Sequence, residues 1–137
     1  MENSKSTGFT YEVRDDGIKI YRLTDLKRDT VEAFFEINLS MGLTTMREGH
    51  HNRSILDVST LLMPTPYAAK RFQKLAALRP KDSRSSVAIL TPSRQLYMFV
   101  RTMLSRVPQN NKSHIRLFSS EEEALAWLDE RLNELGP

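Results

Sequence analysis

Cysteine is absent from this chain of 137 residues, and its absence excludes several kinds of chemistry. Without a thiol there is no disulfide, no thiolate nucleophile and no cysteine-ligated zinc or iron–sulfur site. A protein without disulfides can work in a reducing compartment, so we expect it in the cytoplasm. Glycine is scarce as well, and none of the five glycines builds the glycine-rich loop that a nucleotide pyrophosphate requires. We therefore do not expect nucleotide binding.

Long apolar segments are also absent. Residues 1–8 are polar and lack the apolar stretch of a secretory signal, and no later window is long enough to cross a bilayer. We therefore expect neither export nor membrane insertion. The length suits one domain, so we expect a flexible N-terminal segment over residues 1–8 and a single domain over residues 9–137.

The apolar spacing predicts that the domain opens with a β-hairpin. Phe9, Tyr11 and Val13 alternate with polar residues, as in a strand with one buried face. Residues 15–17, Asp-Asp-Gly, supply a tight turn, and residues 18–23 return as a second strand.

Four helices and three more strands are expected to follow. The first helix spans about Leu26 to Met41, capped by Asp29 or Thr30, and Gly42 and Gly49 bracket the polar connection after it. Short apolar runs predict buried strands at 54–58, 87–90 and 115–118. The other helices begin at Thr65-Pro66, at Thr91-Pro92-Ser93 and at Ser120, which forms a capping-box spacing with Glu123. The positions expected to face the core of these later helices are Ala68, Phe72, Leu75, Ala76, Leu96, Phe99, Val100, Met103, Val107, Leu125, Leu128, Leu132 and Leu135.

These elements predict an α/β fold of order β-β-α-β-α-β-α-β-α. Right-handed crossovers would make the later strands parallel, so we expect a mixed sheet with an N-terminal antiparallel hairpin and packed helices.

The run Phe118-Ser-Ser-Glu-Glu-Glu-Ala-Leu-Ala-Trp-Leu128, together with this element order, resembles the SpoIIAA-like proteins, relatives of the STAS domains of anti-sigma-factor antagonists. The resemblance implies a four-helix, mixed-sheet fold that binds proteins or small ligands without catalysing a reaction. In the antagonists a phosphorylatable serine begins the helix after the central strand. Thr65 occupies the equivalent position here, although the surrounding Met63-Pro-Thr-Pro66 lacks the acidic residue and the glycine of that motif.

Hydroxyl and carboxyl groups are expected to gather at the carboxyl edge of the parallel strands, where ligands of open α/β sheets bind. The residues of this possible partner or ligand edge are Asp57, Ser59, Met63, Thr65, Tyr67, Thr91 and Ser93, with Ser119 and Ser120 beside them. The same serines and threonines are also what helix capping requires. Thr65 is therefore read first as a cap and second as a phosphorylation site, where the helix N-terminus would stabilise the added charge.

The remaining polar residues form no catalytic or metal-binding set. His50 and His51 are adjacent, so their side chains diverge, and we expect both in an exposed loop without a metal. His114 is expected to be a partly buried structural residue, and Trp127 a packing residue. The net charge of +3 comes with basic residues concentrated around the second and third helices, which would suit an acidic partner but not specific nucleic-acid recognition.

Three functions follow from these observations. The first is a non-enzymatic STAS-like module, possibly in bacterial regulation, that docks a protein partner through the second helix and the Met63–Tyr67 loop. The second is a carrier of a small lipophilic ligand, because SpoIIAA-like proteins resemble CRAL-TRIO domains in fold and the helices are rich in Phe, Leu and Met; an apolar cavity would distinguish it. The third, an enzyme, has the least support, since no nucleophile, metal set or cofactor loop can be assembled from the residues, and we expect no cofactor. Leu61 to Met63, if exposed, could also form a contact between subunits of a homo-oligomer.

Overall fold

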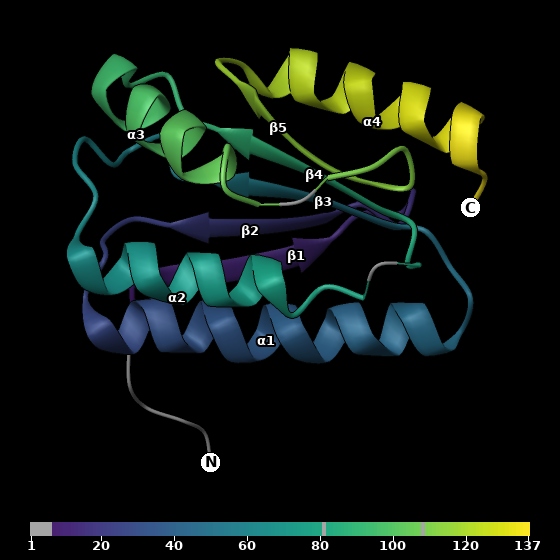
Figure 1. Ribbon diagram of the computed structural model, residues 1–137, viewed down its shortest axis with the longest axis horizontal. Helices are drawn as coiled ribbons and strands as arrows, with labels where there is room; N and C mark the ends of the chain where they lie inside the picture. The colour runs from purple at the N-terminus through teal and green to yellow at the C-terminus, as the bar shows by residue number, and fades with distance from the viewer. Residues whose placement is uncertain (1–6, 81, 108) are drawn as a thin grey trace.

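The computed structural model describes residues 7–80, 82–107 and 109–137 and confirms the predicted order of elements (Figure 1). The elements are β1 (Phe9–Val13), β2 (Lys19–Leu23), α1 (Arg28–Arg47), β3 (Asn52–Asp57), α2 (Pro66–Ala77), β4 (Ser85–Leu90), α3 (Arg94–Leu104), β5 (Ser113–Phe118) and α4 (Glu121–Leu135). Residues 1–8 are predicted to be flexible, and residues 1–6 of this segment lie outside the described residues. None of the helices in the described ranges combines the length and the apolar character needed to cross a bilayer.

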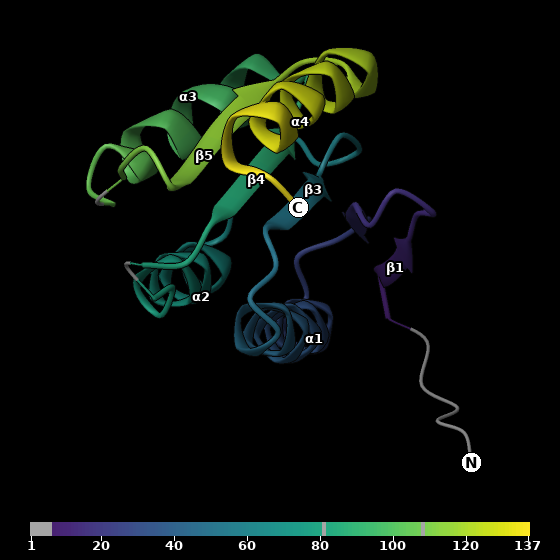
Figure 2. The ribbon, with the colours of Figure 1, turned by 90° about the vertical axis from the view of Figure 1, so that its right-hand side faces the viewer.

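The five strands form one mixed sheet whose spatial order follows the chain, β1-β2-β3-β4-β5. β1 and β2 are antiparallel, and β2 to β5 are parallel, as predicted. Consecutive right-handed crossovers keep their helices on the same side of a sheet. Accordingly α1, α2 and α3 cover one face, whereas α4, which follows the last strand, lies on the other (Figure 2).

Each face has its own apolar core. On the face of the three helices, Tyr21, Phe34 and Ile89 are buried together with residues of α3. On the opposite face, Ile55 and Leu128 are entirely buried in a smaller cluster that also contains Trp127, which confirms the packing role predicted for this tryptophan. The alternation of side chains along each strand supplies both cores from the same sheet.

Three expectations about the first helix and the first strand are wrong. α1 continues to Arg47, because Gly42 lies within the helix and lacks the positive φ of Gly49. Its N-cap is Lys27, which makes no side-chain cap, while Asp29 and Thr30 are inside the first turn. In β1, Tyr11 and Val13 are 48% and 53% exposed, because β1 is an edge strand that the helices only partly cover.

The later helices begin where their capping residues predict. The hydroxyl oxygens of Thr65, Ser93 and Ser120 accept hydrogen bonds from Ala68 N, Leu96 N and Glu123 N at 3.1, 3.3 and 3.2 Å. The core positions predicted for these helices are mostly buried or partly buried. Phe99 is the exception at 37% exposed, because it lies at the margin between α3 and α2.

A chain of buried polar groups joins α4 to the sheet. Arg131 Nε donates to Ser86 Oγ at 2.8 Å, and Ser86 Oγ lies 2.8 Å from His51 Nε2. His51 Nδ1 lies 2.9 Å from the carbonyl oxygen of Gly136, which can only accept, so Nδ1 carries the proton and Nε2 accepts from the Ser86 hydroxyl. Ser86 therefore bonds Arg131 Nε and His51 Nε2 at once, while Arg131 Nη2 has no partner within the described residues.

We predict that Ser86→Ala lowers the free energy of unfolding by about 2–4 kcal/mol, because it leaves buried atoms of Arg131 and His51 without a partner. Ser85→Ala is the matched control: Ser85 is also buried, but its hydroxyl has no partner within the described residues, so its loss should be neutral or slightly stabilising. Urea denaturation of both variants measures the difference. Equal destabilisation would contradict the proposed role of Ser86.

Candidate functional site

A cavity of about 150 Å³ lies between the sheet and the layer of α1, α2 and α3. Its body is lined by aliphatic and aromatic side chains from all of these elements, among them Phe34, Leu56, Phe72, Val87 and Val100. Ligand sites in proteins are typically concave and mainly apolar, with a few polar groups that orient the ligand. An apolar cavity is the feature that distinguishes a carrier of a lipophilic ligand from the other predicted functions.

Small residues on facing surfaces create this space. Gly42 of α1 and Ala69 and Ala76 of α2 line the cavity from the helix side, and Ser54 and Ser85 line it from the sheet. Within α2 only Ala68 is fully buried, whereas Phe72 and Leu75 are partly buried and pack against the core. Close-packed interiors rarely leave room larger than a water molecule, so a cavity of this size is a distinctive feature of the molecule.

Helix α2, which forms one wall of the cavity, is tied to α1 at its N-terminal half. Arg71 Nε and Nη2 donate to the two carboxylate oxygens of Glu32 at 2.6 and 2.8 Å, and the Tyr67 hydroxyl donates to the same carboxylate. The hydrogen bond from Tyr67 and then the pair with Arg71 lower the pKa of Glu32. The same bond raises the pKa of Tyr67. This part of the wall is therefore anchored, and Tyr67 is engaged within the protein.

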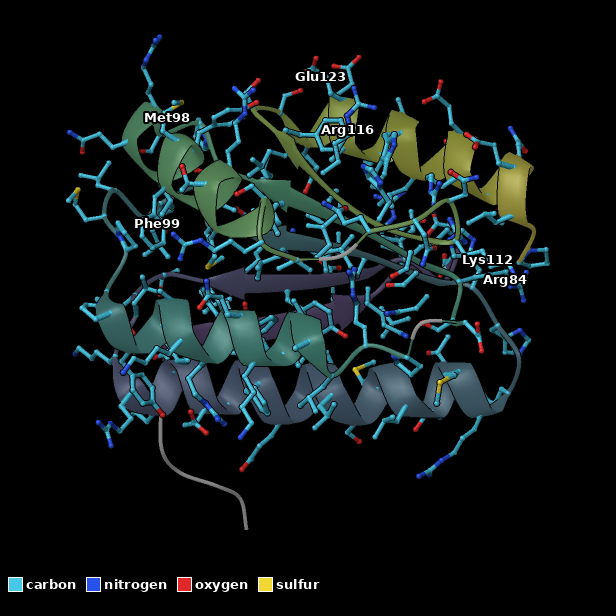
Figure 3. All side chains as sticks on the ribbon, viewed as in Figure 1. Arg84, Met98, Phe99, Lys112, Arg116 and Glu123 are labelled. Carbon is cyan, nitrogen blue, oxygen red and sulfur yellow. The ribbon has the colours of Figure 1, made fainter. Side chains whose placement is uncertain are left out.

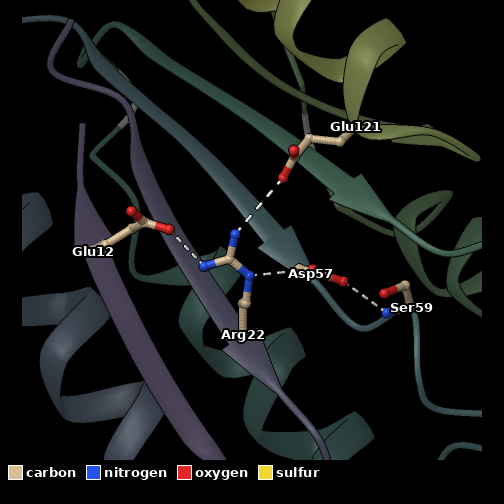
Figure 4. A network of polar contacts seen from close by, with 5 residues as sticks. All are labelled: Glu12, Arg22, Asp57, Ser59 and Glu121. Carbon is tan, nitrogen blue, oxygen red and sulfur yellow. Dashed lines mark hydrogen bonds and ion pairs between the residues drawn. The ribbon is translucent and has the colours of Figure 1, made fainter. Parts of the chain in front are cut away.

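The carboxyl edge of the sheet brings together only some of the residues predicted there, and it adds others (Figure 4). Arg22 donates to Glu12 at 2.7 Å and pairs with Asp57 at 3.5 Å and Glu121 at 3.8 Å. Asp57 also accepts from the backbone of Ser59 at 2.9 Å. The pKa of Arg22 is raised, first by its hydrogen bond with Glu12. Three carboxylates around one guanidinium leave this network acidic, which disfavours a phosphate-bearing ligand.

The other hydroxyl groups predicted at this edge serve the fold. Thr65 and Ser93 cap α2 and α3, and Ser93 Oγ also lies 3.4 Å from the carbonyl oxygen of Leu62. Thr91 is 1% exposed, and its hydroxyl lacks a partner within the described residues. Met63 is 61% exposed and contributes no polar contact. The capping role predicted for Thr65 is confirmed, and its phosphorylation stays a prediction.

The two adjacent histidines have different environments, so the expectation for one of them is wrong. His50 is exposed, as predicted, but His51 is 6% exposed and belongs to the polar chain under α4. His114 is partly buried on β5, with its ring 6.0 Å from that of Trp127. Across residues 7–80, 82–107 and 109–137, no three His, Cys, Asp or Glu side chains are grouped so that they could hold a metal ion.

Comparison with protein-family models, with curated proteins and with solved structures gives no match to this chain. The architecture is compatible with a STAS-like topology, namely a five-stranded mixed sheet with an N-terminal antiparallel hairpin and four helices.

We predict that the protein becomes less stable as the pH falls below about 6.5, the usual pKa of histidine. Burial lowers the pKa of His51, and the nearby Arg53, Arg131 and Arg84 lower it further, against a raising hydrogen bond to Gly136. Below its usual pKa the unfolded chain binds a proton that folded His51 resists, so the free energy of unfolding decreases toward acid. Denaturation at pH 7.5 and 5.5 should show a smaller difference in His51→Gln than in the unchanged protein. An unchanged difference would contradict this assignment.

Proposed function

We propose that the protein is a non-enzymatic carrier of a small lipophilic ligand, a SpoIIAA-like protein that works in the cytoplasm. The observation that supports this function is the apolar cavity between the sheet and the helices α1, α2 and α3. The position of the cavity between secondary-structure layers and its mainly apolar lining both suit a bound organic molecule.

The size of the cavity limits the ligand. A cavity of about 150 Å³ has room for a molecule the size of benzene. The ligand therefore has a compact body of about one ring or a short alkyl chain, and a longer chain would require α2 to move away from the sheet. Native mass spectrometry of freshly purified protein would detect a retained ligand, and an NMR titration with 1-hexanol tests binding directly.

We predict that Gly42→Leu abolishes 1-hexanol binding, with a loss in affinity of tenfold or more, because the new side chain fills the cavity. A Cβ atom at Gly42 would meet only Asn52 Nδ2, at 3.9 Å, and replacing a helical glycine should add about 1 kcal/mol to the free energy of unfolding. Ser40→Leu is the control, since it adds the same side chain at an exposed position of α1. Hexanol binding to Gly42→Leu as tight as to Ser40→Leu would refute the cavity as the binding site.

A second function, the docking of a protein partner, is favoured by a separate apolar surface. Leu62 and Met63 are 69% and 61% exposed before α2. Met98, which Figure 3 labels on α3, is 50% exposed. The hydrogen bond between Ser93 and Leu62 places this loop beside the start of α3. We call Leu62, Met63, Met98 and Phe99 the apolar margin.

The charge around the apolar margin indicates the kind of partner. The helices on either side of the margin carry exposed basic residues, Lys70 and Lys74 on α2 and Arg94 and Arg101 on α3. Neither α2 nor α3 contains an acidic side chain. Two such surfaces would repel each other, so this margin suits an acidic protein better than the second copy of the chain considered for a homo-oligomer.

We predict that a protein that copurifies through the apolar margin is lost from the double variant Leu62→Ser/Met63→Ser, because the variant removes the apolar contact. High salt should also release this protein, because it screens the attraction between the charges. Val13→Ser, which removes an exposed apolar side chain from β1, should retain the partner. Quantitative mass spectrometry of the copurified proteins compares the variants. Equal retention by all of them would argue against docking at the margin.

A further inference from the structure

The cavity is lined by a partly buried cation, Arg79, that no acidic group within the described residues neutralises. Arg79 follows the C-terminal end of α2 and lines the cavity. Its Nε and Nη1 atoms are shielded from solvent and have no hydrogen-bond partner in the described ranges. The ion pairs found in those ranges involve Arg14, Arg22 and Arg71 instead.

The neighbouring groups leave the Arg79 guanidinium available. Arg84, which also lines the cavity, uses Nη1 and Nη2 for the carbonyl oxygens of Leu135 and Gly49, at 2.7 and 2.5 Å. Ser83 donates its hydroxyl proton to the carbonyl oxygen of Pro80 at 2.7 Å. Ser85, by contrast, lines the cavity with a buried hydroxyl that has no partner in the same part of the chain. Arg79 and Ser85 thus place unused donors in one cavity.

A buried, unpaired guanidinium is costly unless another group compensates its charge. Burial lowers the pKa of Arg79, which is the direction expected for an uncompensated cation. A carboxylate is the monoanionic acceptor that a guanidinium N–H prefers, and such charge-assisted hydrogen bonds are stronger than those between neutral groups. The remaining lining is largely apolar, so the same ligand needs an apolar body.

We infer that the ligand is a lipophilic carboxylate, with its apolar body among Phe34, Phe72 and Val100 and its carboxylate on Arg79, assisted by the hydroxyl of Ser85. This inference rests on the proposed function, since it names the head group of the molecule that the cavity binds. One guanidinium and one hydroxyl with buried, unpartnered donors suit a monoanionic carboxylate better than a phosphate dianion, which calls for more donors.

The test compares three probes that separate the head group from the body: hexanoate, 1-hexanol and acetate. Hexanoate should bind about tenfold or more tightly than 1-hexanol, the ratio that corresponds to a charge-assisted hydrogen bond. Acetate, which has the carboxylate without the body, should bind more weakly than either. Calorimetry or an NMR titration above the carboxyl pKa of hexanoate measures all three.

Arg79→Gln should remove the preference for hexanoate and leave the affinity for 1-hexanol unchanged. Lys74→Gln is the matched control, because it makes the same charge change at an exposed position of α2 and should keep the preference. Without ligand, Arg79→Gln should unfold at the same temperature as the unchanged protein or above it, because the replaced cation has no partner to lose.

The outcomes distinguish this inference from the proposed function. Binding of 1-hexanol without a preference for hexanoate would overturn the carboxylate alone. A parallel loss of both ligands in Arg79→Gln would show that Arg79 supports the shape of the cavity instead of the head group. Failure of both hexanol and hexanoate to bind the unchanged protein would overturn the carrier function itself.

Discussion

The strand order is the constraint on which the rest of this structure depends. Because the five strands lie side by side in the order of the chain, each right-handed crossover returns its helix to the same face of the sheet. Three helices therefore share one face, and α4 covers the other without a second helix beside it (Figure 2). The crowded face could be filled completely only by large side chains on the sheet and on α2. The chain instead places Ser54, Ser85, Ala69 and Ala76 there, and the space remains open.

The single helix on the opposite face is held in a different way. Trp127 and Leu128 pack on Ile55 and Leu90, and the polar chain of Arg131, Ser86 and His51 adds directional contacts. Buried directional hydrogen bonds define one arrangement of the helix on the sheet better than apolar packing alone. The two faces thus differ in kind. The layer under α4 combines apolar packing with buried hydrogen bonds, whereas the layer under α1, α2 and α3 is mainly apolar and contains the cavity.

Most of the fold could be predicted from local signals in the sequence. The apolar runs of β3, β4 and β5 and the capping residues Thr65, Ser93 and Ser120 locate their elements because neighbouring residues alone determine them. The end of α1 was predicted wrongly at Gly42 because glycine is a weak helix former that often follows the end of a helix. Here the helix continues beyond it, and local propensity does not determine that. His51 misleads because its partners, Ser86 and Gly136, are distant in sequence and come together only in the fold.

The cavity and the unpaired guanidinium of Arg79 could not be predicted for a related reason. The apolar stripe of α2, with Phe72 and Leu75, can be recognised in the sequence, but the distance between that stripe and the sheet depends on the small residues facing it.

The contact that anchors α2 to α1 also affects how α2 can move. Glu32 holds the helix through Tyr67 and Arg71, in its first half, whereas the half that leads to Arg79 has no comparable ion pair within the described residues. If α2 moves away from the sheet, it would therefore rotate about the Glu32 contact, and its displacement would be largest beside Arg79. A molecule would then enter the cavity at the same end at which its charge is recognised.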